Sequence, residues 1–405
     1  MSVATEGEAA ILAAESNLQA KNRRRTTARR DVPKPALRPA WIEIHLGRLR
    51  RNFEIINRDK PETLQLLSVV KDEAYGHGSL AVAQVALEQE AVFLGLATLE
   101  EALALREKGI IAPMLLLGDR TEEEVPWCIE HDLTCCISET RTVKKLGALA
   151  SAAGKQIPVH VKINTGMNRY GVRWNQAEDL LNDVVSTKSL LLEGVLSHFA
   201  QSDELDKECA FLQLRRFNEV LGLLADRGVQ IRFRHLCNSG GFLDLPQAHF
   251  DMARLGILPL GVYPSSVCRR IDGIEPVMTV KARIAAVQEL EPGDTVGYGM
   301  RYTASSRRRI GVMPLGYGDG YPRVRNQGAV LIHRKRAPLI GGVAMDAFMV
   351  DITDIPQAGL WDEAILMGRQ GEEEISVHEI AKLKNSVSYD VLTSWRARLP
   401  RVYVD

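Results

Sequence analysis

Hydrophobic and polar positions repeat in a regular pattern along residues 63–257 of the chain. Short apolar runs typical of strands alternate with stretches of helical periodicity, at the spacing expected of parallel βα units. The strand-like runs are 64–70, 92–97, 113–117, 133–137, 157–163, 192–198, 231–236 and the shorter 250–257. The helical stretches are 79–90, 99–108, 121–130, 139–152, 175–186 and 205–227. About eight units favour an α/β fold of the TIM-type (β/α)8 barrel class over an open sheet, and we assign it to residues 39–270.

The pattern changes after about residue 270. Short strand-like runs follow one another, and turns rich in Gly, Pro and Asp separate them, which predicts a C-terminal, mostly-β domain over residues 271–405. These runs are 277–290, 309–315, 329–333, 338–343 and 348–352. One short helix is expected at 376–383, and a helix and a strand within 389–404.

The first 38 residues are predicted to form a flexible tail. Residues 1–20 lack the basic start and apolar core of a secretory signal. The basic cluster Lys21–Arg30 has two interpretations: contact with nucleic acid or anionic lipid, or a solvated terminus, and the second is the commoner case.

Composition excludes several classes of protein. The chain has 405 residues, a formal net charge of zero and 25% charged residues, so no overall field favours nucleic acid or membranes. No apolar run approaches the length of a membrane span. The six cysteines have neither CxxC nor disulfide-framework spacing, which indicates buried thiols in a reducing, cytoplasmic compartment. Cys135 and Cys136 are adjacent in a strand, so their side chains are expected on opposite faces.

Lys71 ends the first buried strand and precedes the glycine-bracketed Tyr75–Gly78. The C-terminal ends of barrel strands carry catalytic groups, and desolvation there lowers the pKa of a lysine and favours its nucleophilic neutral amine. The alternative is a lysine that only extends to solvent from a strand end.

Polar segments follow other predicted strands, at the same end of the barrel. They are Lys162–Gly171, Ser197–Asp203, His235–Gly241 and the region of Arg254. Taken singly, His198 fits a core histidine, Arg254 an ion pair and Ser239 a helix N-cap. Together with Lys71 they fit a phosphorylated aldehyde cofactor. Residues with zinc-ligand spacing are absent, and no metal is expected.

The chain resembles the alanine racemase family over about residues 40–405. The segments that carry the resemblance are Val70–Gly78, Lys162–Gly171, Ser197–Ala200, Ala248–Arg254, Asp294–Gly299, Pro314–Arg323 and Gly342–Asp346. The resemblance implies pyridoxal 5'-phosphate as cofactor, a homodimer with active sites shared between subunits, and racemisation of L-alanine to D-alanine for cell-wall peptidoglycan.

The resemblance also implies a role for each residue of the site. Lys71 would hold the cofactor covalently and act as base on one face of Cα, and Tyr298 of the partner subunit would act on the other, since racemisation needs a proton removed from one side and returned from the other. Arg254 would contact the pyridine nitrogen and, because a guanidinium stays protonated, leave that nitrogen unprotonated.

The remaining roles concern binding and positioning. Tyr75, Ser239, Gly256 and Ile257 would bind the phosphate. Arg169 would touch the cofactor's phenolic oxygen and the substrate, and Lys162 matches a lysine that is carbamylated in many relatives. Met345 and Asp346 would bind substrate from the partner chain, His198 and Asp203 would tune Arg254 and Tyr298, and Tyr317 and Arg323 would narrow the entrance.

Several positions depart from the family's usual pattern. Asp72-Glu73 stand where Ala-Asn is usual, Asn164 replaces an Asp, and Leu255 a proline. Ala397 stands where alanine racemases carry a tyrosine whose hydroxyl reaches the phosphate. The absence of this tyrosine is expected to enlarge the substrate pocket, unless Trp395 fills the space. This leads to the hypothesis of a broad-specificity racemase for serine or larger amino acids.

Two other classes of function remain as alternatives. A basic amino-acid decarboxylase of this architecture is disfavoured, because its glycine-triplet phosphate loop and C-terminal cysteine motif are absent from the sequence. A non-catalytic cofactor-binding barrel is disfavoured because small proteins of that kind lack the second domain.

Overall fold

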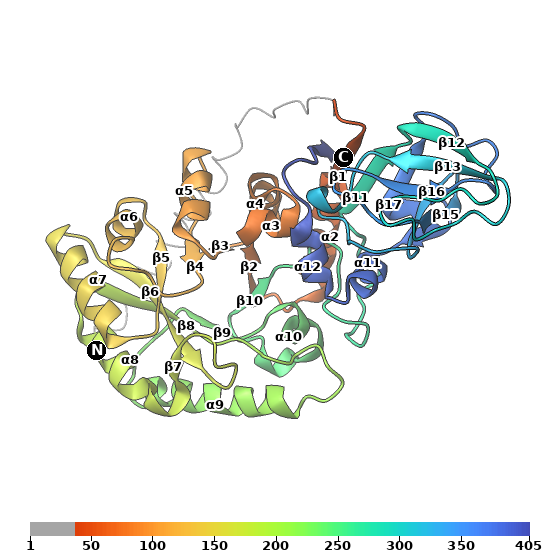
Figure 1. Cartoon of the computed structure of the whole chain (residues 1–405). Helices are drawn as coiled ribbons and strands as arrows, with labels where there is room; N and C mark the ends of the chain where they lie inside the picture. Colours follow the sequence, from red (N-terminus) through yellow and green to blue (C-terminus); the bar gives the residue numbers. More distant parts are fainter. Residues whose placement is uncertain (1–36) are drawn as a thin grey trace.

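The computed structural model describes residues 37–405, and these form a parallel barrel followed by a mostly-β domain (Figure 1). The barrel strands pair in the order β10-β2-β3-β4-β5-β6-β8-β9. Between β9 and β10, the N–H groups of Asp251 and Arg254 donate to the carbonyls of Arg234 (3.1 Å) and Cys237 (3.0 Å), so the ring is nearly closed. The strands are β2 (Gln65–Val69), β3 (Phe93–Leu96), β4 (Met114–Leu116), β5 (Thr134–Ile137), β6 (Ile157–Asn164), β8 (Leu190–Leu196), β9 (Phe233–His235) and β10 (Met252–Leu255), with the short β7 (Val172–Arg173) beside β6. The predicted barrel is confirmed.

Helices lie between successive strands and cover the barrel. They are α2 (Leu46–Asp59), α3 (Lys71–Gly76), α4 (Ser79–Glu88), α5 (Leu99–Glu107), α6 (Val125–Glu130), α7 (Thr140–Ala152), α8 (Ala177–Ser186), α9 (Glu208–Ala225) and α10 (Ser239–Asp244). Helix α6 begins four residues later than predicted, at Val125, because Pro126 fits the first turn of a helix. No helix within residues 37–405 is long and apolar enough to cross a membrane.

Two layers of apolar side chains hold the barrel together. The inner layer includes Leu67, Phe93, Cys136 and Phe233, whereas Cys135 belongs to the large outer cluster beneath the helices. The two adjacent cysteines therefore face opposite sides of β5, as predicted. All six cysteines are free thiols.

The second domain is built on one large, mainly antiparallel sheet with the strand order β12-β13-β16-β15-β14-β17-β11-β1-β19, and β18 pairs with β17. Its strands are β11 (Met278–Arg283), β12 (Ala286–Leu290), β13 (Arg308–Met313), β14 (Ala329–Ile332), β15 (Lys335–Ile340), β16 (Phe348–Asp351), β17 (Glu363–Gln370), β18 (Glu373–Ile375) and β19 (Arg401–Val404). Helices α11 (Val377–Lys384) and α12 (Ser388–Ser394) complete it. The mostly-β character is confirmed, but the sequence pattern missed β17 and β18.

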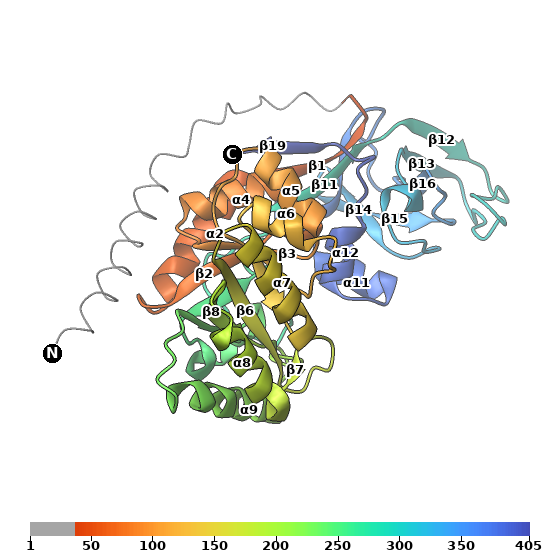
Figure 2. The same cartoon turned by 90° about the vertical axis from the view of Figure 1, so that its left-hand side faces the viewer.

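The first described strand, β1 (Ala40–His45), lies in the residue range predicted for the barrel and yet pairs in the second sheet. It runs antiparallel to β11 and parallel to β19, and Figure 2 shows the three strands side by side. Most of the predicted tail, 1–36, lies outside the described residues. Arg38 lies inside them, and its guanidinium binds the carboxylate of the fully buried Asp319 (2.6 Å).

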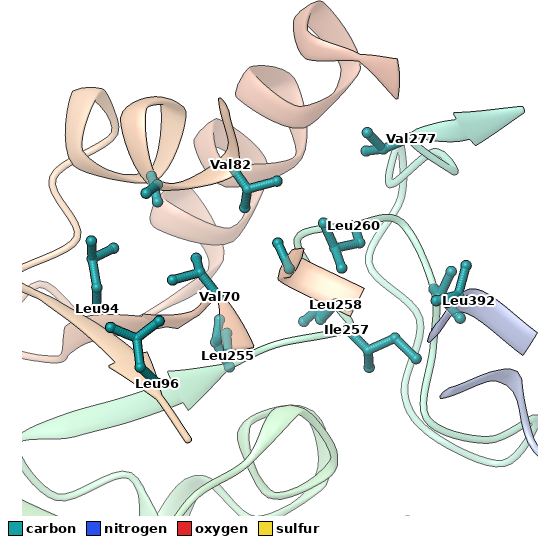
Figure 3. Packing of buried hydrophobic residues seen from close by; sticks show 14 of the residues in the cluster. Val70, Val82, Leu94, Leu96, Leu255, Ile257, Leu258, Leu260, Val277 and Leu392 are labelled. Carbon is teal, nitrogen blue, oxygen red and sulfur yellow. The ribbon is translucent and has the colours of Figure 1, made fainter. Parts of the chain in front are cut away.

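Apolar packing also joins the barrel to the second domain. Figure 3 shows Leu260 between Val70 and Leu255 on the barrel side and Val277 and Leu392 on the other. This contact places α12 beside α3, the segment that begins at Lys71.

Candidate active site

The backbone after Lys71 makes an unusual left-handed turn. Four consecutive residues that are not glycine, Asp72–Tyr75, have φ between 50° and 53°. Each such residue costs about 1–2 kcal/mol, so the turn needs support from its surroundings. The carboxylate of Glu101 accepts the Asp72 N–H (2.7 Å), and the Glu73 carbonyl accepts the Gly78 N–H (2.7 Å). The turn therefore holds Lys71 at the C-terminal mouth of the barrel while Tyr75 folds back behind it.

The second domain packs directly on this turn. At Gly76, which has φ of 80°, a Cβ would lie 2.4 Å from the carbonyl oxygen of Leu392, and the Gly76 carbonyl accepts from Arg401 Nε (3.2 Å). Only glycine fits at this close approach. The position of Lys71 thus depends on α12 and β19 as well as on the barrel.

Burial and neighbouring positive charge act on the Lys71 ammonium. Its pKa is lowered, first by desolvation and then by the nearby Arg169 guanidinium. Lys162 points into the barrel from β6 and is 5% exposed, and its pKa is lowered to about 8, mainly by burial, with Arg254 and Arg169 contributing. Both lysines therefore hold a larger neutral fraction than an exposed lysine does.

Arg254 is 3% exposed and lies at the centre of the rim. Its Nη1 donates to the carbonyl (2.9 Å) and the Nδ1 (3.2 Å) of His235, and its Nη2 to the Ser197 carbonyl (2.7 Å) and to His198 Nδ1 (3.1 Å). The pKa of Arg254 is lowered to about 10, chiefly by burial. Hydrogen bonds to His235 on one side and to Ser197 and His198 on the other hold the guanidinium in place.

The four residues predicted to bind phosphate gather at one place. A Cβ on Gly256 would lie 2.5 Å from the Tyr75 hydroxyl, and Ser239 Oγ lies 3.4 Å from the amide nitrogen of Leu258. Within the described residues, the N–H groups of Gly256 and Ile257 have no acceptor. Free amides beside two hydroxyl groups form a concavity suited to an anion.

The residues predicted in the second domain are exposed or half-buried. Tyr298 is 82% exposed and Met345 is 51% exposed. The Asp346 carboxylate binds Arg398 (2.5 Å). Arg323 lies over the ring of Tyr317 (5.7 Å), so the structure brings the two predicted entrance residues together. Asp203 lies beside Gly240, and among the described residues it has no hydrogen bond to His198 or Arg254.

Comparison with known proteins shows the family of the chain. The model of "Alanine racemase, N-terminal domain" matches residues 44–264, and that of "Alanine racemase, C-terminal domain" matches 277–403. An alanine racemase of Carboxydothermus hydrogenoformans is 38% identical over 91% of this chain and 100% of its own length. The chain belongs to the alanine racemase family. Among solved structures, the alanine racemase of Clostridium difficile superposes with a TM-score of 0.86 at 32% identity, covering 92% of this chain and 97% of its own. A histidine racemase of Leuconostoc mesenteroides superposes with a TM-score of 0.83 at 26% identity, covering 93% and 100%.

Members of the alanine racemase family use pyridoxal phosphate. The sequence predicts that this chain departs from the family pattern at Ala397. Ala397 is exposed. Trp395 is 3% exposed and its ring lies 6.3 Å from that of Tyr321, inside the second domain. The indole is thus part of the core of the second domain.

Several residues at or below the rim had no role predicted from the sequence. Tyr389 packs edge-on against Tyr75, with ring centroids 6.0 Å apart. His235 and His160 are fully buried and bonded to each other. The sequence pattern could have identified the two histidines, because each interrupts an apolar strand at a position that faces the barrel interior.

Proposed function

We propose that this member of the alanine racemase family interconverts L- and D-alanine with pyridoxal phosphate, by a two-base mechanism that uses Lys71 and Tyr298. The observation that carries the proposal is the grouping of Lys71, Arg254 and the phosphate concavity at one mouth of the barrel. Family membership supports the reaction class, and the geometry supports the proposed assignment of residues.

The residues present fit the cofactor. The free N–H groups of Gly256 and Ile257, with the hydroxyl groups of Tyr75 and Ser239, would bind its phosphate. Lys71 would hold the aldehyde carbon, and Arg254 would donate to the ring nitrogen. When bound, pyridoxal phosphate makes the α-proton of an amino acid acidic enough to be removed.

The proton transfers belong to this chain's own side chains. Lys71 Nζ would take the α-proton on one face, and its lowered pKa favours the free amine that a base requires. Tyr298 would act on the opposite face, and its 82% exposure supports action across a subunit boundary. The proposed assembly is a homodimer, in which the partner subunit's Tyr298, Met345 and Asp346 complete each site.

Arg254, Lys162 and Arg169 have supporting roles in this proposal. A guanidinium remains protonated and would keep the ring nitrogen unprotonated, which limits protonation at the wrong carbon. The Lys162 pKa of about 8 leaves part of the amine neutral, the form that carbon dioxide carbamylates, and a carbamate there would pair with Arg169. Six free thiols support a reducing, cytoplasmic location.

Chiral product analysis tests the proposal. The purified chain, supplied with pyridoxal phosphate, is expected to bring L-alanine and D-alanine to the same equimolar mixture from either side. Lys71→Ala should lose both this activity and the visible absorbance of the bound cofactor. Activity that survives Tyr298→Phe undiminished from both enantiomers would refute the two-base mechanism.

A broad-specificity racemase is the second candidate. Two observations favour it: the small Ala397 is exposed at a position where the family resemblance implies a tyrosine, and a histidine racemase has this fold although its substrate has a larger side chain. A panel of L-amino acids in the same assay separates the two, since a dedicated enzyme turns over only alanine at an appreciable rate.

A further inference from the structure

A row of polar side chains runs through the interior of the barrel below the active-site rim. It begins at Arg254, whose Nη1 lies 3.2 Å from His235 Nδ1. His235 Nε2 lies 2.8 Å from His160 Nδ1, and His160 Nε2 lies 3.4 Å from Glu193 Oε2. Both histidines are 0% exposed, whereas the Glu193 side chain is 14% exposed and also faces Arg232 (3.7 Å). The row therefore connects the rim with the surface.

Arg254 determines which ring nitrogen of each histidine in this row carries the proton. A guanidinium can only donate, so His235 Nδ1 must be an acceptor and His235 carries its proton on Nε2. That proton points at His160 Nδ1, so His160 in turn carries its proton on Nε2 and donates it to the carboxylate. All three hydrogen bonds consequently run in one direction, from Arg254 to Glu193. Burial, with His160 and Arg254 adding to it, lowers the pKa of His235 well below 6.5, which keeps that ring neutral.

The surrounding residues are shaped to accommodate this row. A Cβ on Gly194 would lie 2.7 Å from the His160 ring, so any other residue at 194 would push the ring aside. Phe93 and Phe233 pack around His160, with ring centroids at 5.7 and 6.1 Å, and exclude water from it. A row of polar side chains in an apolar interior is tolerated only when its polar groups are hydrogen-bonded, and the groups of this row are.

We propose that Glu193 is a positioning residue for Arg254, acting through His160 and His235 to hold the guanidinium charged and directed at the ring nitrogen of the cofactor. The inference rests on the proposed function, because it assumes that Arg254 meets that nitrogen. It adds a remote residue that controls the outcome of the reaction without touching substrate or cofactor.

The direction of the effect follows from electrostatics in a poorly polarisable interior. The carboxylate polarises His160, which makes His235 Nδ1 a better acceptor and stabilises the guanidinium. Without that charge, Arg254 releases its proton more readily to the ring nitrogen. Transamination would then compete with racemisation. Each such event converts one alanine and the cofactor's aldehyde into pyruvate and the cofactor's amine form.

Glu193→Gln tests this, because it removes the charge and keeps the oxygen acceptor. Pyruvate released per racemisation event is expected to rise about tenfold, the size of a one-unit change in pKa. Arg232→Gln breaks the other ion pair of Glu193, and Asp251→Asn breaks the Arg234 ion pair (2.7 Å) on the neighbouring strands. Both controls should leave the ratio within about twofold of wild type, because each leaves the Glu193 carboxylate and its contact with His160 in place. An unchanged ratio in Glu193→Gln, or an equal rise in Asp251→Asn, overturns the inference.

A measurement on the cofactor-free protein does not depend on activity. Nitrogen-15 spectra of histidine-labelled wild type should show His160 and His235 as neutral rings protonated on Nε2. A proton on Nδ1 of either ring contradicts the proposed direction, even if Glu193→Gln fails to fold. Inactive wild-type enzyme would instead refute the proposed function, which separates the two failures.

Discussion

Lys71, Lys162 and Arg254 are three basic side chains at one end of the barrel, and burial is the main cause that lowers the pKa of each. Repulsion from the Arg169 guanidinium also lowers the pKa of each of the three. Few carboxylates stand close enough to offset it, so the rim is a region of unbalanced positive potential. Such a region favours a phosphate and a substrate carboxylate before any specific hydrogen bond forms.

His77, in the motif that follows Lys71, gives a prediction about pH. Burial lowers its pKa from 6.5 to about 4. Because the unfolded chain binds a proton at higher pH than the folded one, this residue lowers stability as pH falls from about 6.5 towards 4. The loss should reach about 2 kcal/mol near pH 5.

Urea unfolding of wild type and His77→Asn at pH 7 and pH 5 measures this loss. Asparagine keeps a donor for the carbonyls of Ala74 and Tyr75, which His77 Nδ1 now contacts at 3.1 and 3.0 Å. The variant should lose less stability than wild type between the two pH values. Equal losses would show that His77 does not titrate differently in the folded and unfolded states.

Ala397 gives a prediction about specificity. Ala397→Tyr narrows the pocket and adds a hydroxyl for the phosphate, so kcat/KM for L-serine relative to L-alanine should fall about tenfold. Steady-state kinetics on both substrates, with Ala397→Ser as a small-residue control, measure the ratio. The same ratio in all three proteins would mean that position 397 does not control the pocket.

Among the elements, the left-handed turn Asp72–Tyr75 is the most constrained. Glu101 supports it and also completes a capping box with Thr98 at the start of α5. Glu101→Ala removes the acceptor of the Asp72, Ala97 and Thr98 N–H groups and should destabilise the fold by about 2–3 kcal/mol. Cofactor affinity should fall as well, since Tyr75 ends the turn.

Thermal unfolding and a fluorescence titration with pyridoxal phosphate measure both effects of Glu101→Ala. The adjacent Glu100 is exposed on the same helix, and Glu100→Ala is the matched control. If both variants bind the cofactor as tightly as wild type, the turn does not need Glu101.

Periodicity was sufficient to predict the barrel, because each buried parallel strand is a short apolar run between amphipathic helices. It missed β17, whose apolar run Ala364–Met367 lies between charged residues and depends on pairing with β11 and β14, distant in sequence. It also could not place β1, because alternation identifies a strand and not its sheet. Rim residues at strand ends were predictable from position, whereas the partners of Arg254 depend on the barrel closing.

At the scale of the whole molecule, the proposed homodimer would divide each active site between two chains. Lys71 lies in the barrel rim, and the exposed Tyr298 lies in the second domain. Head-to-tail pairing of two chains would bring each half to its complement, and two-fold symmetry would then form two equal sites. Each barrel would thus depend on the partner chain for the second base, Tyr298.

Mixed dimers test this arrangement. Lys71→Ala and Tyr298→Phe are each expected to be inactive alone, but a heterodimer of the two contains one site with both residues intact. Unfolding and refolding an equal mixture should restore about a quarter of wild-type activity, because half of the dimers are mixed and each has one working site. If each chain used its own pair of residues, no activity would return.

Strand β1 has a consequence for synthesis of the chain. Its partners β11 and β19 leave the ribosome more than two hundred residues later, so β1 must wait beside a growing barrel with its edges unpaired. At about 5–20 residues per second this wait lasts on the order of ten seconds or more. The barrel must therefore complete its own folding first, and every nascent chain passes through a stage in which an apolar strand, Ala40–Ile44, is open to association with others.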